Sequence, residues 1–263
     1  MDRSQVAKLW ETNAEAWTHL VRAGCDVYRD GLNTPAFLAL LPPLIGLIGI
    51  DIGCGEGSNT RQMAKLSARM CGIDVAPTFI HYARESETAD PLGIRYEVAD
   101  GQSLPFPDAA FDFATAFMSL MDMPEPALAL REAARVLRPG GFLQFSILHP
   151  CFAPPYRRVL REPDGTVRAI EVAGYLDRVD GKIETWCFSE ASGERRQKFE
   201  PFRIPRFHRT LGEWIDMVLD AELAIEKIAE PTATDEEVAR FPALDDTKVV
   251  PLFLIVRARK KSA

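Results

Sequence analysis

The stretch Ile50-Asp51-Ile52-Gly53-Cys54-Gly55-Glu56-Gly57 decides which fold this chain is expected to adopt. It begins as a buried strand and breaks into a loop with glycine at every second position, ahead of a helical pattern over residues 58–66. Glycines in such a loop leave out Cβ atoms where a ligand must lie against the backbone. Asp74 closes the next apolar stretch about 20 residues later, where a carboxylate can hold a ribose diol. Together these features predict a site for an adenosine-containing small molecule.

On both sides of this loop, short apolar runs alternate with helical patterns. Alternation of apolar strands with helices indicates right-handed crossovers and a parallel sheet covered on both faces, so an α/β fold is expected. The expected strands are 47–52, 69–74, 94–100, 111–117 and 142–148, and the expected helices are 58–66, 77–84 and 125–137.

The two ends of the chain and one long interruption complete the expected organisation. Apolar residues recur at helical spacing over residues 6–21, which predicts an amphipathic helix laid over the core with its two tryptophans on one side. The alternation lapses after residue 149, resumes with a helix at 211–219 and ends in strands at 223–228 and 249–256, followed by a basic solubilising tail. We therefore expect a single domain divided into an N-terminal helical lid (1–45), a cofactor-binding core (46–149), an inserted substrate cap (150–209) and a C-terminal helix with final strands (210–263).

Bulk composition narrows the class of partner. The 263 residues suffice for one catalytic domain with an insertion, and the net charge of −7 argues against a general affinity for nucleic acid. Five scattered cysteines without a CxxC pair predict a reduced, cytoplasmic protein with no metal site. The polar N-terminus lacks a signal-peptide layout, and prolines and glycines interrupt the apolar run 36–50, so no membrane association is expected. A monomer or homodimer with a small-molecule substrate is expected.

The order of motifs along the chain distinguishes between two classes of nucleotide-binding protein. Ser58 stands where the dinucleotide fingerprint GxGxxG has its last glycine, which counts against NAD. Asp74, Asp100-Gly101 and Leu137-Arg138-Pro139-Gly140-Gly141 follow in order. With these motifs, residues 47–148 resemble the class I S-adenosylmethionine-dependent methyltransferases, most closely the type 11 methyltransferase domain of ubiquinone- and menaquinone-biosynthesis enzymes. The resemblance implies a Rossmann-like, seven-stranded, mostly parallel sheet in the order 3-2-1-4-5-7-6, with the last strand antiparallel.

The same resemblance implies where S-adenosyl-L-methionine binds and S-adenosyl-L-homocysteine is released. The glycine loop would hold the methionine portion, an acid after the second strand the ribose hydroxyls, and the turn after the third strand the adenine. For Asp51 and Cys54, a role in loop geometry or packing is the alternative. The implied cofactor-binding residues are Asp51, Gly53, Cys54, Gly55, Asp74, Val75, Asp100, Gly101, Gln102, Phe117 and Met118.

Candidate residues for the acceptor side carry less specific signals. His149 ends the fifth strand, where ligands of open α/β sheets bind, and an imidazole there could remove a proton, so it is the first candidate base; His208 is a weaker one. A histidine that bonds the turn before Pro150 is the alternative. Trp10 and Trp17 are either core residues or part of a cofactor lid. Tyr28 and Arg29 either contact the cofactor or acceptor or belong to a surface loop.

The basic and aromatic residues of the cap allow two interpretations. They could bind an anionic or aromatic substrate, although a solvated basic face paired with nearby acids is the commoner outcome for such a pattern. The residues concerned are Arg195, Arg196, Lys198, Phe199, Phe202, Arg203, Arg206, Phe207 and Arg209.

The expected reaction is methyl transfer to a small organic acceptor at oxygen, nitrogen or carbon. Residues 116–122, which follow the fourth strand, lack the (Asp/Asn)-Pro-Pro-(Tyr/Phe) motif of enzymes that methylate amide or base nitrogens, and no magnesium-ligand set is evident. Two alternatives stay open from the sequence: an NAD(P)-dependent oxidoreductase, and a non-catalytic regulator that binds S-adenosylmethionine.

Overall fold

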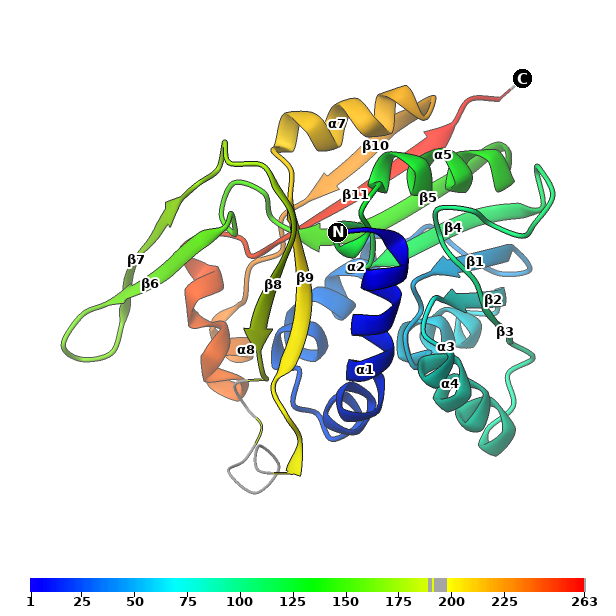
Figure 1. The fold of residues 1–263 in the computed structure, drawn as a ribbon. Helices are drawn as coiled ribbons and strands as arrows, with labels where there is room; N and C mark the ends of the chain where they lie inside the picture. Colours follow the sequence, from blue (N-terminus) through cyan, green and yellow to red (C-terminus); the bar gives the residue numbers. More distant parts are fainter. Residues whose placement is uncertain (189–190, 192–197, 263) are drawn as a thin grey trace.

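A seven-stranded sheet in the order β10-β11-β5-β4-β1-β2-β3 forms the centre of the molecule (Figure 1). The computed structural model describes residues 1–188, 191 and 198–262. The five neighbouring strands from β5 to β3 run parallel, whereas β11 is antiparallel to both β5 and β10. The predicted α/β fold, strand order and antiparallel last strand are confirmed. The strands are β1 (Ile48–Ile52), β2 (Arg69–Asp74), β3 (Arg95–Val98), β4 (Phe111–Phe117), β5 (Leu137–Leu148), β10 (Leu223–Ala229) and β11 (Phe253–Lys260).

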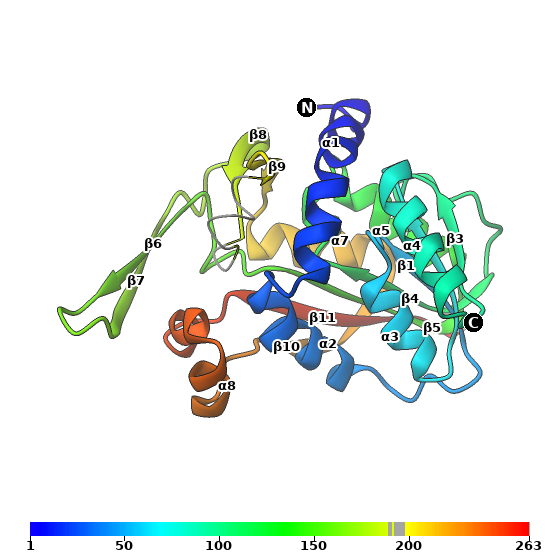
Figure 2. The same ribbon diagram turned by 90° about the horizontal axis from the view of Figure 1, so that it is seen from below.

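Helices cover both faces of this sheet (Figure 2). On one face, Met63 and Ile80 pack with Phe113 of β4 in one core cluster. On the other face, Leu130 and Trp214 pack against the opposite side chains of the same strands. This two-sided burial explains why the central strands are apolar along their whole length. The first face carries α2 (Thr34–Leu40), α3 (Ser58–Lys65) and α4 (Pro77–Ala89), and the second carries α5 (Pro126–Val136) and α7 (Leu211–Asp220).

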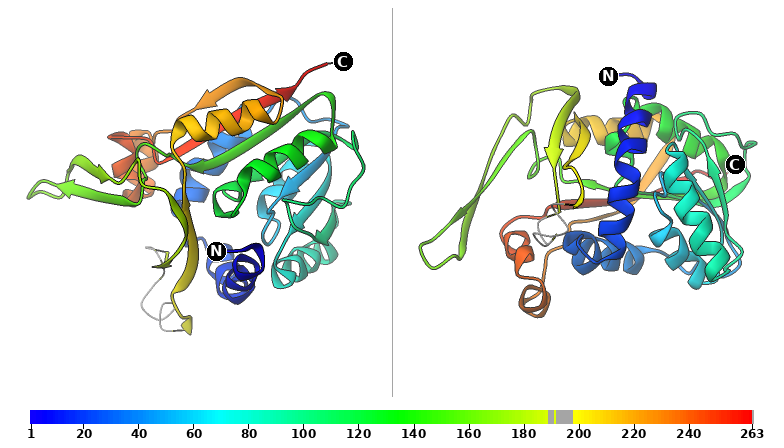
Figure 3. Two further views of the ribbon diagram at one scale, coloured as in Figure 1. Left: turned by 45° about the horizontal axis from the view of Figure 1, so that its top comes forward. Right: turned by 60° about the horizontal axis from the view of Figure 1, so that its bottom comes forward.

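The N-terminal helix α1 (Arg3–Arg22) lies between α4 and strand β9 (Phe202–His208) (Figure 3). Its start is fixed by a capping box, in which the Asp2 side chain accepts from the Gln5 amide. The Asn13 side chain donates to the Arg203 carbonyl at 3.0 Å and accepts from the Arg203 amide at 3.2 Å. The helix predicted over residues 6–21 is therefore confirmed, and it is tied to the segment predicted as a cap.

The segment between β5 and α7 forms two separate ladders outside the main sheet. β6 (Tyr156–Arg161) and β7 (Val167–Ala173) make a hairpin that projects from the body, with its turn at residues 162–166 (Figure 1). β8 (Val179–Trp186) pairs with β9. The remaining elements are short: η1 (Arg29–Asn33), η2 (Leu120–Asp122), α8 (Asp235–Arg240) and η3 (Pro242–Lys248). In the described part of the chain, no helix has the length and apolar content needed to cross a membrane.

The prediction of a basic tail after residue 256 is wrong. Arg259 and Lys260 belong to β11, which begins at Phe253 and not at residue 249. The Lys260 ammonium donates to the Ala134 and Leu137 carbonyls at 2.8 Å each, and Arg259 donates to the Gly140 carbonyl at 2.6 Å. These side chains satisfy carbonyls in the last turn of α5 and at the start of β5, so their charge stabilises the fold.

Residues 137–141, which precede the expected strand 142–148, belong to β5 and form a bulge within it. β5 begins at Leu137, which pairs with Phe111, whereas Phe142 pairs with Phe113. The extra residues on β5 contain Gly140, whose φ of 78° lies in the left-handed region.

Candidate active site

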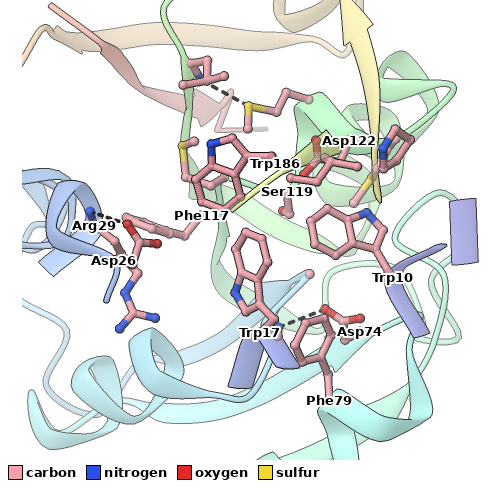
Figure 4. Close-up of a pocket in the computed structure, with 18 of the residues that line it drawn as sticks. Trp10, Trp17, Asp26, Arg29, Asp74, Phe79, Phe117, Ser119, Asp122 and Trp186 are labelled. Atoms are coloured by element: carbon pink, nitrogen blue, oxygen red, sulfur yellow. Dashed lines mark hydrogen bonds between the residues drawn. The ribbon is translucent and has the colours of Figure 1, made fainter. Parts of the chain in front are cut away.

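A cavity of about 940 Å³ opens at the carboxyl ends of β1, β2 and β4, beneath α1 and the β8–β9 ladder (Figure 4). Ligand pockets in proteins commonly have about 300–1,000 Å³, so this volume is at the upper end of that range. Ligands of open α/β sheets bind outside the carboxyl ends of the strands, as here. The cavity therefore has room for more than one small molecule.

The loop after β1 presents its backbone to this cavity. Gly53 and Gly55 have φ values of 74° and 54°, and the amides of Gly53 and Cys54 donate to the Ile73 carbonyl at 2.9 and 2.8 Å. A Cβ at Gly53 would lie 2.4 Å from the Ser119 Cβ, whereas a Cβ at Gly55 would meet nothing within 4 Å. At Gly53 a side chain would collide with Ser119, so glycine is required by the packing of the protein. At Gly55 the space beside the backbone is empty and can hold a ligand.

Asp74 ends β2 and holds this loop in place. Its Oδ2 accepts from the Gly55 amide and its Oδ1 from the Ala76 amide, both at 2.9 Å. Burial raises the pKa of Asp74 to about 6, and the two amide hydrogen bonds partly offset that effect. Since each carboxylate oxygen can accept two hydrogen bonds, Asp74 keeps capacity for a further donor on the cavity side.

Asp51 lines the same cavity, but both of its oxygens are already engaged. Thr60 and Thr115 donate their hydroxyls to Asp51 at 2.6 and 2.8 Å. Burial raises the pKa of this carboxyl above its usual range, and the hydroxyls partly offset the effect. Cys54 also lines the cavity, and burial together with nearby acids raises the pKa of its thiol. The contacts of Asp51 favour a role in fixing the loop to α3 and β4.

The turn after β3 is built around Asp100. The Asp100 Oδ1 accepts from the Gln102 amide at 2.8 Å and from the Gln102 Nε2 at 3.1 Å, and Arg3 NH1 of α1 lies 3.6 Å from Oδ2. Gln102 in turn accepts from the Glu125 amide at 2.9 Å. This network fixes the turn and leaves part of the Asp100 carboxylate at the cavity, which Gly101 and Gln102 also line.

Four residues predicted at the lid or acceptor side also line the cavity. The rings of Trp10 and Trp17 meet edge to face, with centroids 5.4 Å apart. Tyr28, however, donates its hydroxyl to the Ala243 carbonyl at 2.6 Å, so only its ring is directed to a ligand. Arg29 pairs with Asp30 at 2.7 Å. The structure thus brings together Trp10, Trp17, Tyr28 and Arg29 with Asp51, Gly53, Cys54, Gly55, Asp74, Val75, Asp100, Gly101, Gln102, Phe117 and Met118.

The two predicted histidine bases are not part of this group. His149 is buried, its Nε2 lies 2.7 Å from Glu230 Oε1, and its Nδ1 accepts from the Cys151 amide. The Nε2 of His208 lies 2.8 Å from the Tyr175 carbonyl, and burial lowers the pKa of this imidazole. Neither residue lines the cavity. The structure thus favours the alternative for His149, a histidine that bonds the turn after β5, and the expectation of a base at either position is corrected.

The cap residues do not form one shared basic face. Arg195 and Arg196 lie outside the described residues. Arg209 is buried and donates to the Val179 and His208 carbonyls at 3.0 and 2.8 Å. Arg206, which donates to the Ala153 and Pro154 carbonyls, lines the cavity. Among the members of this set that the structure describes, only Arg206 lines the cavity.

Several acidic residues at the cavity were missed by the sequence reasoning. Glu56 is buried and lies 3.7 Å from both Arg22 and Arg29. Burial raises the pKa of Asp26 to about 6 and that of Asp122 to about 8. Glu56 is visible inside the glycine loop, whereas Asp26 and Asp122 stand in segments without a recognisable pattern. Across the described ranges, no group of three histidine, cysteine or acidic residues is arranged to hold a metal ion.

Comparison with known proteins defines the class to which the chain belongs. Residues 50–145 match the family model described as a methyltransferase domain. A solved structure of an S-adenosylmethionine-dependent methyltransferase from Mesorhizobium loti superimposes with a TM-score of 0.70 at 28% identity, covering 86% of this chain and 96% of that one. The chain therefore contains a methyltransferase domain and has the fold of an S-adenosylmethionine-dependent methyltransferase. Within that class, its core is a methyltransferase domain of type 11.

Two curated relatives match a shorter part of the chain. An O-methyltransferase (cnsE) of Penicillium expansum is 38% identical over 117 residues, which cover 42% of each chain. A demethylmenaquinone methyltransferase of Tropheryma whipplei is 36% identical over 163 residues, which cover 60% of this chain and 66% of the relative. The matched stretch thus spans less than two thirds of either relative.

Proposed function

We propose that this protein transfers a methyl group from S-adenosylmethionine to a small organic acceptor, at oxygen, nitrogen or carbon, and releases S-adenosylhomocysteine. The observation that carries the proposal is the exposed backbone at Gly55 beside the Asp74 carboxylate, in a cavity large enough for cofactor and acceptor. The names of the relatives, which include an O-methyltransferase and a quinone methyltransferase, support a small-molecule acceptor.

Each part of the cofactor has a suitable partner in the cavity. The amino acid portion would lie along the backbone of Gly53 and Gly55, and the ribose hydroxyls would donate to Asp74. Asp100 would accept from the adenine amino group, with the backbone of Gly101 and Gln102 beside the ring. A buried amino acid, diol and exocyclic amine each need such polar partners. Apolar walls would come from Val75, Phe117 and Met118, while Asp51 and Cys54 would fix the loop.

The chain's own contribution to the reaction is alignment and exclusion of water. S-adenosylmethionine, when bound, supplies a methyl group already activated by its sulfonium. Residues 1–45 and 150–209 would act as lid and cap, and Trp10, Trp17 and Trp186 from these segments line the cavity. Holding two reactants in line in a water-free site lowers the barrier without a covalent step on the protein.

Isothermal titration with S-adenosylmethionine and S-adenosylhomocysteine tests the cofactor assignment. We expect dissociation constants in the micromolar range and no heat with NADH. Absence of binding at millimolar concentrations of both ligands would refute the proposal. Heat with NADH alone would favour the oxidoreductase alternative.

Turnover separates an enzyme from a non-catalytic regulator. Release of S-adenosylhomocysteine should depend on an acceptor when a broad panel of hydroxyl, amine and carbon nucleophiles is supplied. Cofactor binding without methyl transfer to any member of the panel would favour the regulator.

A further inference from the structure

The carboxylate of Asp122 lines the cavity and holds no other part of the described chain in place. Asp122 ends η2, four residues after Met118, and lines the cavity that also holds Asp74. Within the described part of the chain, no donor is hydrogen-bonded to this carboxylate. Figure 4 shows Asp122 with Ser119 and Trp186 on one side of the space, and Asp74 with Phe79 on the other. A half-buried carboxylate that lines a cavity without a bonding partner has both oxygens available to a ligand donor.

A guanidinium on β9 acts on this carboxylate. The positive charge of Arg206 lowers the pKa of Asp122, in opposition to the larger effect of burial. Arg206 does not form an ion pair with Asp122; its Nη2 is bound to carbonyls of the turn before β6, and its buried Nε has no partner among the described residues. The cavity is thus lined by an acceptor without a bonding partner in the described chain, Asp122, and by a guanidinium whose positive charge acts on it, Arg206.

The other charged groups on the elements that pack against η2 are either exposed or paired with other residues. The elements packed on η2 are β9, β5 and α5. Arg203 of β9 and Arg131 of α5 are exposed side chains on these elements. The paired groups are Glu125 with Arg3, Glu132 with Arg135 and Arg138 with Asp112.

Aromatic rings form the walls beside these two polar groups. Trp17 lies 5.6 Å from Trp186 and 5.0 Å from Phe188, measured between ring centroids. Trp10, Trp17 and Trp186 all line the cavity. Flat indole surfaces favour a planar, unsaturated ligand.

We propose that the methyl acceptor is an aromatic hydroxyl compound, and that Asp122 takes the proton of its hydroxyl while Arg206 faces the oxygen. The proposal rests on the methyl-transfer function proposed above. In the ionised form that acts as the base, Asp122 would repel an aryl carboxylate. An aryl amine is neutral, but its nitrogen gains positive charge as it is methylated, which the charge of Arg206 would disfavour. An aryl hydroxyl can donate to the carboxylate and then, as its oxygen gains negative charge, be stabilised by the positive charge of the Arg206 guanidinium.

The proton and electron balance of this step is simple. The aryl O–H bond breaks and its proton goes to the Asp122 carboxylate. The oxygen lone pair forms the new bond to the methyl carbon, as the carbon–sulfur bond breaks and its electron pair passes to sulfur. The products are an aryl methyl ether and a neutral thioether, and Asp122 afterwards returns the proton to water.

The pH dependence follows from the burial of Asp122. Its pKa of about 8 keeps this carboxyl mostly protonated at neutral pH. Because the ionised form is the base, turnover should rise with pH, reach half its maximum near 8 and level off above it. An Arg206→Met variant removes the charge that lowers this pKa, so the midpoint should move to higher pH.

The test uses 1-naphthol as probe acceptor, with 1-naphthylamine and 1-naphthoate as matched alternatives. Wild type should form the naphthyl methyl ether, detected by mass spectrometry. Asp122→Asn should lower kcat by about 100-fold or more, with KM and S-adenosylhomocysteine affinity changed less than about threefold, and should lose the pH dependence. Asp216→Asn, an exposed substitution of the same kind on α7, should behave as wild type.

A binding measurement provides a readout apart from turnover. Quenching of tryptophan emission should give the dissociation constant of 1-naphthol on the protein loaded with S-adenosylhomocysteine. Trp186→Ala should weaken it by about 3–10-fold, and Asp122→Asn by less than about threefold.

The outcomes are separable. Preferred methylation of the amine or carboxylate, or wild-type kcat and pH profile in Asp122→Asn, would overturn the assignment of acceptor and base. The same holds if 1-naphthol is neither bound nor methylated by protein that binds S-adenosylhomocysteine. Failure to bind S-adenosylhomocysteine at all would instead contradict the proposed methyltransferase function.

Discussion

A single carboxylate, Asp74, connects the glycine loop to the second strand and offers its remaining lone pairs to the cavity. It was predictable from the sequence, because an acid at the end of a strand about 20 residues after a glycine loop has one common use. Asp122 was not predictable, since its place in the cavity depends on how the chain turns after β4. His149 illustrates the reverse case: it ends the expected strand, but its side chain turns toward Glu230 and away from the cavity.

Replacement of Asp74 should weaken cofactor binding. Asp74→Ala removes the acceptor for the ribose hydroxyls and should cost about 1–3 kcal/mol of binding free energy, measured by titration with S-adenosylhomocysteine. Asp216→Asn serves as the control, and circular dichroism checks that the variant is folded. An unchanged affinity in a folded variant would refute the ribose assignment.

The raised pKa of Asp74 predicts a pH dependence of the same affinity. The carboxyl accepts hydrogen bonds best when ionised, so affinity should be full above pH 7 and fall as the pH drops through about 6. Titrations at a series of pH values measure this directly. A flat affinity down to pH 5 would show that the ionised carboxylate is not the acceptor.

Thr115 should matter for stability more than for binding. Thr115→Val keeps the shape but removes the hydroxyl that donates to buried Asp51, leaving an oxygen unsatisfied. The free energy of unfolding should fall by about 1–3 kcal/mol in chemical denaturation. No loss of stability would mean that the loop does not depend on this bond.

At the scale of elements, most helices and strands of the core were predictable because their apolar periods are clear. The expected last strand began too early, since the apolar residues Val249 and Val250 resemble the start of a strand but lie in the segment between η3 and β11. The charged residues of β11 resembled a tail because only tertiary contacts show where their ammonium and guanidinium groups bind. The pairing of β8 with β9 and their packing against α1 likewise depend on tertiary contacts, which the local sequence does not indicate.

The contact between α1 and the β8–β9 ladder should contribute strongly to stability. Trp17 packs on Trp186, Phe188 and Phe202, with ring centroids 5.6, 5.0 and 5.0 Å away. Trp17→Ala should lower the free energy of unfolding by roughly 3 kcal/mol, at the low end of values for buried aromatic residues. Lys8→Ala on the exposed face of α1 should change it by less than about 0.5 kcal/mol. Equal effects of the two substitutions would contradict this packing role.

At the scale of the whole molecule, the cavity is lined by segments from both ends of the sequence and from residues 184–206. The fold and strand order followed from the motifs, and the comparisons confirm the class. The acceptor side could not be predicted, because Trp10, Trp186 and Arg206 are far apart in the sequence and meet only in the folded chain.

A ligand that bridges these segments should stabilise the entire fold. S-adenosylhomocysteine at about 100 times its dissociation constant should add about 2.7 kcal/mol, which raises the melting temperature of a domain of this size by about 5–10 °C. NADH at the same concentration should leave it unchanged. Thermal unfolding followed by circular dichroism measures both, and an equal rise with NADH would contradict the cofactor assignment.

The position of β11 has a consequence for synthesis on the ribosome. β10 is translated first, yet its partner in the sheet is β11, which lies between it and β5. A nascent chain halted before Phe253 would contain the glycine loop and all five parallel strands, but the edge of β5 would be open and β10 would have no place in the sheet. Exposed strand edges invite pairing with other chains, so this late insertion is the step at which a growing chain is most exposed to aggregation.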